Sequence, residues 1–281
     1  MISRLRMTVL VENEAKAPLV AEHGFAVWIE ADETRILFDT GQGAALLPNA
    51  AALGVDLRTA QHIVISHGHY DHTGGLAAVL TLAPGATVWV HPGSLHVKYA
   101  RQPAPPHRSI GMAEATASFL RSRANVVWTE LPSAITDGVT ATGRIPRRNA
   151  CEQFSGHFYL DKECTVPDEL VDDQALFINT HYGVVLLLGC AHSGVINTCS
   201  YVSELAGGRT CTIIGGMHLL NAGQERLDAT VNLFRRLKPD VIAPCHCTGE
   251  RATEVIEKAL PESFHLCSTG SSFEQHECTS G

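Results

Sequence analysis

The chain has 281 residues, of which 45% are hydrophobic and 18% charged, and this composition excludes a disordered or fibrous protein. Its formal net charge of −8, without a long basic run, argues against a nucleic-acid partner and favours a small-molecule substrate. Histidine is the outlier, since 15 residues of this common metal ligand stand beside only 5 tyrosines.

Short apolar segments alternate along the chain with residues typical of turns. In chain order, strands are predicted at Met7–Val11, Gly24–Ile29, Arg35–Phe38, His62–Ile65, Thr87–Val90, Ala175–Ile178, Val184–Leu188, Thr212–Ile214 and Val241–Ala243. Helices are predicted at Ala44–Leu53, Gly75–Leu82, Ile196–Leu205, Glu225–Leu237 and Ala252–Ala259. This interleaving predicts an α/β or mixed αβ fold. The polar tail after Ser272 is expected to fray.

No linker divides the chain, so we expect residues 1–281 to form a single domain. The stretch from about residue 92 to 157 has a mixed pattern, with prolines at 103, 105 and 106. Such a pattern is typical of a lid or substrate-loop insertion.

The cysteines and the apolar segments bear on the compartment. Nine cysteines are an odd number and form no CxxC pair, which favours free thiols in a reducing environment. The first apolar stretch is too short for a signal peptide, and none reaches the roughly 18 apolar residues of a membrane helix. We therefore expect a cytoplasmic protein without a membrane partner, either a monomer or a homo-oligomer.

Four predicted strands end in small residues followed by histidine. IVISHGH ends at His67 and His69, VLLLGCAH at His192, TIIGGMH at His218 and VIAPCH at His246. Ligand sites of α/β proteins gather at the carboxyl ends of strands, so these histidines are expected to converge. The alternative for each one alone is a core or capping histidine with local hydrogen bonds.

The densest cluster is SHGHYDHTGG, residues 66–75, with three histidines and one aspartate. His67 and His69 are two residues apart and so point to one side of an extended segment. Asp71 and His72 follow where the chain turns into a helix, and they can face a second ion. Imidazole and carboxylate ligands suit zinc, manganese or iron better than calcium or magnesium.

This cluster resembles the HxHxDH signature of the metallo-β-lactamase superfamily, as does FDTG at residues 38–41. FDTGQG, SHGHYDHTGGL, GCAHSGVIN, GGMHL and PCHCTG are together similar to one branch. That branch is labelled dihydropteroate-synthase-like, or 7,8-dihydropterin-6-methyl-4-(β-D-ribofuranosyl)aminobenzene-5′-phosphate synthase-like. The resemblance spans about residues 22–270. It implies a four-layer αββα sandwich, with two sheets face to face and helices outside.

The resemblance also implies one or two divalent ions, with zinc first and manganese or iron as alternatives. Its implied ligands are His67, His69 and His192 for the first ion and Asp71, His72 and His246 for the second. Asp39 would orient a ligand or its loop. The aspartate that bridges the two ions in many members is missing from TIIGGMH. Either no residue bridges, or His218 stands in, or Asp172 or Asp173 approaches.

Other residues near these motifs have weaker signals. Cys190, Cys245 and Cys247 neighbour the histidines but are expected to be buried thiols, with the two beside His246 facing away from the metal. His23 is a candidate for the pocket lining. Arg108, Arg144, Arg147 and Arg148 are candidates for binding a phosphate or carboxylate, with a solvated surface as the alternative.

The expected function is a metal-dependent hydrolase of a small-molecule ester, either a phosphoester or phosphodiester, or a lactone or other carboxylic ester. An activated water attacks, with Asp71 and His218 as catalytic groups and His218 as proton donor to the leaving group. The alternatives are a pterin–aminobenzene transferase, an iron-dependent redox member of the superfamily and a non-catalytic ligand sensor.

Overall fold

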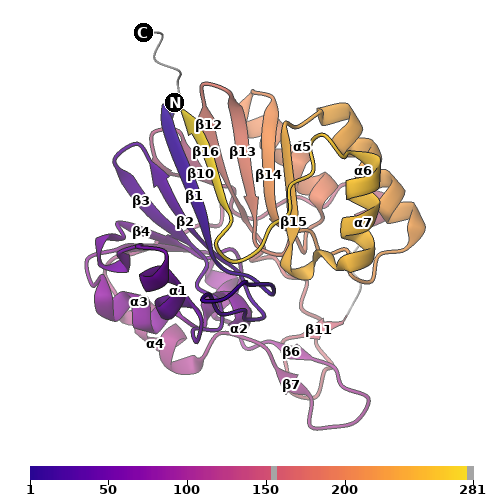
Figure 1. The fold of residues 1–281 in the computed structure, drawn as a ribbon. Helices are drawn as coiled ribbons and strands as arrows, with labels where there is room; N and C mark the ends of the chain where they lie inside the picture. Colours follow the sequence, from indigo (N-terminus) through magenta and orange to yellow (C-terminus); the bar gives the residue numbers. More distant parts are fainter. Residues whose placement is uncertain (153–156, 277–281) are drawn as a thin grey trace.

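In a computed structural model, which describes residues 1–152 and 157–276, two β-sheets pack face to face between two layers of helices (Figure 1). In sheet order, the first sheet has β16 (Ser272–His276), β1 (Arg4–Val11), β2 (Ala26–Ala31), β3 (Thr34–Phe38), β4 (His62–Val64), β5 (Thr87–Val90) and β8 (Val126–Trp128). The second has β15 (Val241–Cys245), β14 (Thr210–Gly216), β13 (Gly183–Leu188), β12 (Ala175–Thr180), β10 (Val139–Ala141) and β9 (Ser133–Thr136). The predicted αββα sandwich is thus confirmed.

The helices cover the outer faces of both sheets. They are α1 (Leu46–Ala52), α2 (Tyr70–Thr73), α3 (Leu76–Leu82), α4 (Glu114–Ser122), α5 (Val195–Ala206), α6 (Gln224–Leu237) and α7 (Glu250–Ala259). Short 3₁₀ turns lie at η1 (Leu57–Thr59), η2 (Pro92–Leu95), η3 (Ala150–Glu152) and η4 (His246–Thr248). Helices α1, α3 and α4 pack on the first sheet, and α5, α6 and α7 pack on the second (Figure 1). Within the described ranges, no helix is long and apolar enough to cross a membrane.

Strand β13 shows why the sandwich forms from this sequence. Its Val185 and Leu187 side chains lie in the core between the two sheets, whereas Val184, Leu186 and Leu188 lie under the helices. Alternate residues of a strand face opposite sides, and a strand buried on both sides needs a continuous apolar run. The run VVLLL meets that need.

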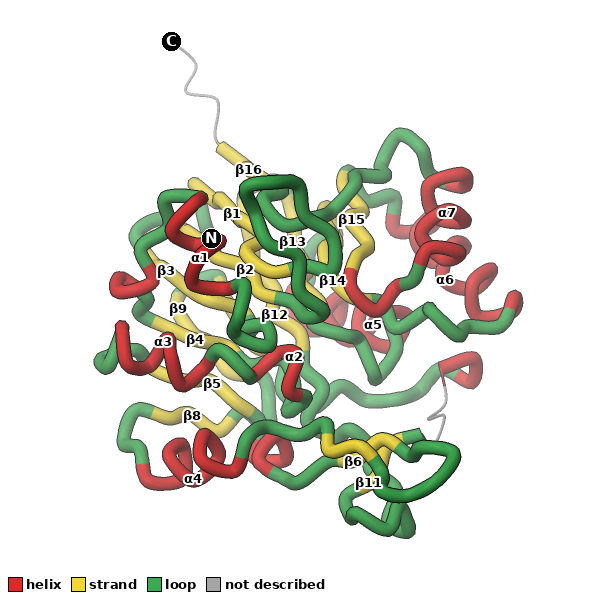
Figure 2. The backbone as a smooth tube through the Cα atoms, turned by 60° about the horizontal axis from the view of Figure 1, so that its bottom comes forward, coloured by secondary structure: helices red, strands yellow, loops and turns green. Residues whose placement is uncertain are grey.

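The parallel strands direct the histidine segments to one edge of the sandwich. β3, β4, β5 and β8 run parallel in the first sheet, and β13, β14 and β15 run parallel in the second. Segments that follow β4, β13, β14 and β15 therefore emerge at carboxyl ends, the edge that Figure 2 turns toward the viewer.

A small third sheet lies beside this edge. It consists of β6 (Tyr99–Ala100), β7 (Arg108–Ser109) and β11 (Phe158–Tyr159), in the order β11-β6-β7 (Figure 1). Two of its strands come from the stretch predicted as an insertion, and the third begins just after residue 157. Part of that stretch, residues 153–156, lies outside the described residues.

One expectation about the fold is wrong. The tail after Ser272 does not fray at once, because residues 272–276 form β16 and pair antiparallel with β1. Backbone pairing with β1 orders this segment, and its Phe273 packs against the core between the sheets. Residues 277–281 lie outside the described residues.

A buried ion triad joins Lys98, which precedes β6, to the loop before β12. Lys98, only 1% exposed, places its Nζ 2.7 Å from Asp168 Oδ2 and 2.9 Å from Asp172 Oδ1. Asp172 Oδ2 also accepts a hydrogen bond from the Gly68 backbone N–H at 2.8 Å. A Cβ on Gly68 would lie 2.3 Å from the Ser94 carbonyl oxygen, so only glycine allows this approach.

The triad makes the free energy of unfolding depend on pH in the acidic range. Burial raises the pKa of Asp172, but Lys98 and the Gly68 N–H outweigh it and lower that pKa to about 2. Because the folded-state value lies below the unfolded one, the stabilisation is complete above about pH 4 and is lost as pH falls toward 2. For Asp172→Asn we expect a loss of about 2 kcal/mol at neutral pH, measured by urea unfolding.

The exposed Asp137 provides the matched control, since Asp137→Asn should leave the unfolding free energy within about 0.5 kcal/mol of the wild type. The difference between wild type and Asp172→Asn should shrink between pH 4 and pH 2. A difference that stays constant over this range would contradict the assignment.

Candidate metal centre

Three histidines from two strand ends bring their ring nitrogens together. His67 and His69 follow β4, and His67 Nε2 lies 2.9 Å from His69 Nδ1. His192 follows β13, and its Nε2 lies 3.2 Å from His67 Nε2. Nitrogens that share one tetrahedral ion at 2.0–2.1 Å are about 3.3 Å apart. The spacing matches that of a single ion.

A second group lies beside the first and contains Asp71, His72 and His246. His246 Nε2 is 3.2 Å from His72 Nε2 and 3.5 Å from Asp71 Oδ2. The rings of His67 and His72 have centroids 4.2 Å apart, so the two groups are contiguous. The structure thus brings all six predicted ligands into one cluster, and metal binding by them stays a prediction.

His23 joins the second group from the loop before β2. Its Nε2 lies 3.2 Å from Asp71 Oδ2, and its side chain is 54% exposed. The hydrogen bond to Asp71 outweighs burial and raises the pKa of His23. His23 therefore lies on the solvent side of the cluster.

Asp39 fixes the orientation of two ligands from beneath the cluster. It is fully buried, and its Oδ2 accepts hydrogen bonds from His72 Nδ1 at 2.7 Å and from Ser66 Oγ at 2.6 Å. Its Oδ1 accepts from the Ser66 backbone N–H at 2.7 Å, and Ser66 Oγ is 2.9 Å from His67 Nδ1. With both Nδ1 atoms engaged, the Nε2 atoms of His67 and His72 point into the cluster.

His246 is held by two residues that sequence reasoning missed. Asn13 Oδ1 lies 3.1 Å from His246 Nδ1, and the Asn13 amide donates to the His246 carbonyl at 3.0 Å. Glu12, just after β1, accepts the His246 backbone N–H at 2.7 Å. Neither residue stands in a recognisable motif. Their position just after the predicted strand Met7–Val11 was the only available signal.

Burial decides the charge state of the first group. It lowers the pKa values of His67, His69 and His192, with that of His69 falling to about 3, and neighbouring rings lower the pKa values of His67 and His192 further. These rings are therefore neutral at pH 7, and their converging nitrogens carry lone pairs. Such an arrangement repels itself unless a cation shares the lone pairs, so the donors fit a divalent metal.

The second group pairs an ionised carboxylate with a histidine that holds its proton at neutral pH. Burial raises the pKa of Asp71, but His72, His23 and His246 outweigh it and hold this carboxyl ionised. Burial lowers the pKa of His72, yet Asp39 and Asp71 together raise it to about 9. An ionised carboxylate among imidazoles is a donor set for zinc, manganese or iron.

The expectation about Cys247 is wrong. Its Sγ does not face away from the cluster but accepts the His218 backbone N–H at 3.3 Å and groups with Cys190 and His218. The expectation assumed extended chain after β15, whereas His246 has φ of +52° and begins the 3₁₀ turn η4. Strict alternation of sides ends there. Cys245 does face away, into the core between the sheets.

Cys190 is buried as expected, but it lies against the predicted ligands. Its Sγ is 3.3 Å from His72 Nε2. His67, His72 and Cys190 together form a group whose ligand atoms all lie within 4.8 Å of one another. Burial raises the pKa of this thiol well above its usual range.

Neither Asp172 nor Asp173 approaches as a bridging ligand. Asp172 binds Lys98 and the Gly68 N–H, and Asp173 Oδ2 accepts the Ser193 backbone N–H at 2.7 Å. Both carboxylates support the loops that carry ligands, since Gly68 lies between His67 and His69 and Ser193 follows His192. That alternative for the missing bridge is wrong.

His218 and Phe158 border the first group of histidines. The His218 ring centroid lies 4.4 Å from that of His192. The Phe158 ring, from β11, lies 5.1 Å from that of His69 and 5.6 Å from that of His192. Phe158 had no sequence signal, because its role comes only from the small sheet that places it over the histidines.

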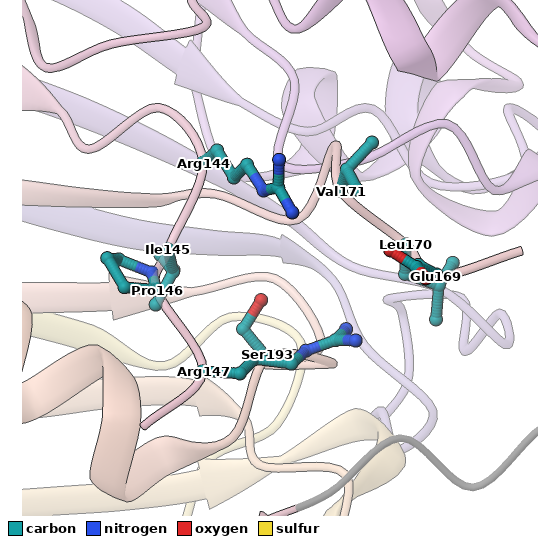
Figure 3. A pocket seen from close by; sticks show the side chains of 8 residues that line it. All are labelled: Arg144, Ile145, Pro146, Arg147, Glu169, Leu170, Val171 and Ser193. Atoms are coloured by element: carbon teal, nitrogen blue, oxygen red, sulfur yellow. The ribbon is translucent and has the colours of Figure 1, made fainter. Parts of the chain in front are cut away.

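An arginine-lined cavity of about 480 Å³ opens beside His192. Its lining includes Arg144, Arg147, Glu169 and Ser193, and Figure 3 shows both guanidinium groups extending toward the segment Glu169–Val171. Arg147 also donates to the His192 carbonyl at 3.3 Å, which ties the cavity to the first group.

The other two candidate arginines lie elsewhere. Arg148 pairs with Glu204 at 2.7 Å. Arg108 lies over the Tyr70 ring, with its Cζ 5.4 Å from the ring centroid. The four arginines therefore do not form one anion-binding group.

Comparisons with known proteins agree with this fold and cluster. The model of the metallo-β-lactamase superfamily matches residues 19–147. The Methanocaldococcus jannaschii protein MJ0448 is 33% identical over 249 residues, covering 87% of this chain and 91% of its own. The chain belongs to the metallo-β-lactamase superfamily.

Two further relatives place it more closely. The 7,8-dihydropterin-6-methyl-4-(β-D-ribofuranosyl)-aminobenzene-5′-phosphate synthase of Methanocaldococcus jannaschii is 26% identical, with 96% of both chains covered. The solved structure of Tm1679, described as a metal-dependent hydrolase of the β-lactamase superfamily, is 29% identical with a TM-score of 0.83, and the match covers 97% of this chain and 100% of that one. The resemblance to the synthase branch is confirmed.

Removing the Asp39 carboxylate tests its role in orienting ligands. We expect Asp39→Asn to weaken zinc binding about 10- to 100-fold, because the amide cannot accept hydrogen bonds from both His72 and Ser66 in the same way. Competition with a chromogenic chelator measures this affinity. Asp137→Asn, which changes an exposed carboxylate away from the cluster, should leave the affinity unchanged. Equal zinc affinity in wild type and Asp39→Asn would contradict the proposed orientation.

Proposed function

We propose that this protein is a metal-dependent hydrolase of an anionic small-molecule ester, either a phosphoester or phosphodiester, or a lactone or other carboxylic ester. The observation that carries the proposal is the convergence of His67, His69 and His192 beside Asp71, His72 and His246. Its relation to Tm1679, described as a metal-dependent hydrolase, supports the same reaction class.

The six side chains would hold one or two divalent ions, of which zinc is the best fit to the donor set. When bound, such ions supply Lewis-acid activation of the ester and of a water at neutral pH. Asp39 and Asn13 keep the ligand rings in place before the ion arrives, so little reorganisation is needed.

Asp71 and His218 are the proposed catalytic side chains. Asp71 stays ionised and can orient the attacking water through a hydrogen bond. His218 lies against His192 on the side of the first group and can donate a proton to the leaving oxygen. Phe158 covers His69 and His192, which limits access of bulk water.

The substrate is proposed to bind its anionic group in the cavity beside His192. Arg144 and Arg147 offer two guanidinium groups there against the single carboxylate of Glu169. Guanidinium groups bind phosphate and carboxylate through charge-assisted hydrogen bonds.

Eight cysteines of the described residues are free, which fits the proposed cytoplasmic location.

A pterin–aminobenzene transferase is the second candidate. It is favoured by the 26% identity to the Methanocaldococcus jannaschii synthase over 96% of both chains. Incubation with dihydropterin pyrophosphate and an aminobenzoate-type acceptor separates the two reactions. A coupled product favours the transferase, and release of pyrophosphate without coupling favours the hydrolase.

Removing the metal or its ligands tests the hydrolase directly. Chelation, His67→Ala and His192→Ala should each abolish metal content and hydrolysis together, because the three ring nitrogens hold the first ion jointly. Metal is measured by inorganic mass spectrometry, and turnover with a chromogenic phosphodiester and a lactone. The exposed His181 gives the control variant His181→Ala, which should keep both. Full activity after chelation would rule out the proposal.

The arginine cavity gives a separate prediction about substrate binding. We expect Arg144→Gln to raise KM for an anionic ester about 10- to 100-fold with little change in kcat, since a charge-assisted hydrogen bond is lost. Arg148→Gln removes a guanidinium that pairs with Glu204 and should leave KM unchanged. An equal rise in KM for a neutral ester, or for Arg148→Gln, would contradict a role of Arg144 in binding the anion.

A further inference from the structure

We infer that Cys190 is a metal ligand whose sulfur is shared between the two ion positions, in place of the missing bridging aspartate. The inference rests on the metal centre of the proposed function and adds a seventh side chain to it. It also changes the chemistry of the centre, because a thiolate then stands among imidazoles and one carboxylate.

The sulfur lies near ligands of both ion positions. Cys190 Sγ lies 3.3 Å from His72 Nε2, which belongs to the second group. It also lies within 4.8 Å of the ligand nitrogen of His67, which belongs to the first group. A bridging atom must be adjacent to one ligand of each ion. The side chain is only 4% exposed, so the sulfur faces this cluster rather than solvent.

The contacts of the segment after β13 place this cysteine against the cluster. Ala191, between Cys190 and His192, has a φ of +50°, so the chain turns here and strand alternation does not set the direction of the thiol. The 3.3 Å contact of Cys190 Sγ with His72 Nε2 puts the sulfur on the side of the ligands. Gly189 allows the close approach, because a Cβ there would lie 2.1 Å from Ser66 Oγ. The segment Gly189–Cys190 is thereby packed against the residue that precedes His67.

Cys247 is the competing sulfur, but its hydrogen bonds are to backbone groups. Its Sγ accepts the His218 backbone N–H at 3.3 Å and lies 3.5 Å from the Cys190 carbonyl oxygen. Among the described residues, the group that contains predicted ligands together with a cysteine is His67, His72 and Cys190. We therefore assign Cys247 to positioning the Cys190 and His218 backbone.

A sulfur ligand narrows the choice of metal. Thiolate favours zinc and iron, whereas manganese prefers oxygen donors. When the ion binds, the thiol gives up its proton to solvent and the S–H bond is replaced by a metal–sulfur bond, with no change in oxidation state. The protein should therefore take up zinc from an equimolar mixture of zinc and manganese.

X-ray absorption at the zinc edge tests the inference on the full chain loaded with zinc alone. The wild type should show a sulfur scatterer at about 2.3 Å in addition to the nitrogen and oxygen shell at 2.0–2.2 Å. Cys190→Ser should lose the sulfur shell, and zinc content should fall toward about one ion per chain. Cys247→Ser and the buried control Cys199→Ser should retain both.

The outcomes separate this inference from the proposed function. Zinc bound only by nitrogen and oxygen in the wild type overturns the sulfur ligand and leaves the hydrolase proposal standing. A wild type that binds no zinc overturns both. Loss of the sulfur shell in Cys247→Ser, with its retention in Cys190→Ser, overturns the assignment to Cys190. If Cys190→Ser does not fold, a sulfur shell kept in both Cys247→Ser and Cys199→Ser supports Cys190.

Discussion

The carboxylate of Asp39 is the contact on which the arrangement of the cluster depends. This fully buried side chain follows β3, and it accepts hydrogen bonds from the Ser66 backbone, the Ser66 hydroxyl and His72 Nδ1. The Asp39 carboxylate thus connects the ends of β3 and β4. It orients His72 directly and His67 through Ser66, and these two histidines belong to different ion positions. A buried carboxylate needs such donors to offset its desolvation, and the donors in turn become fixed.

The two sheets make this junction possible by delivering ligands from opposite sides. β4 carries His67 and His69 to the edge from the first sheet, while β13 and β15 carry His192 and His246 from the second. The core between the sheets keeps these strand ends side by side, so packing energy holds the imidazoles close together. The fold thereby brings together ring nitrogens that can bind a cation.

Long periodic segments and strand-end motifs were predictable from the sequence, and the short or contact-dependent features were not. The apolar run of β13 and the helices α6 and α7 follow from burial patterns that span whole elements. The strand β16 is polar and exists through pairing with β1, and the small sheet has strands of two residues. The β-propensity of so few residues carries little information, because tertiary contacts decide whether such short segments form strands. Cys190 is buried as the sequence predicted, but its contact with His72 depends on a turn at Ala191, whose φ is +50°, and spacing alone did not reveal that contact.

The central claim is that six side chains from two sheets form one metal centre for one or two ions. Anomalous scattering from a zinc-soaked crystal, recorded above and below the zinc edge, tests it most directly. The account predicts a peak against His67, His69 and His192 and, where the second ion binds, another about 3.5–4 Å away against Asp71, His72 and His246. A zinc peak on other residues, or no peak at the edge of the sandwich, would contradict it.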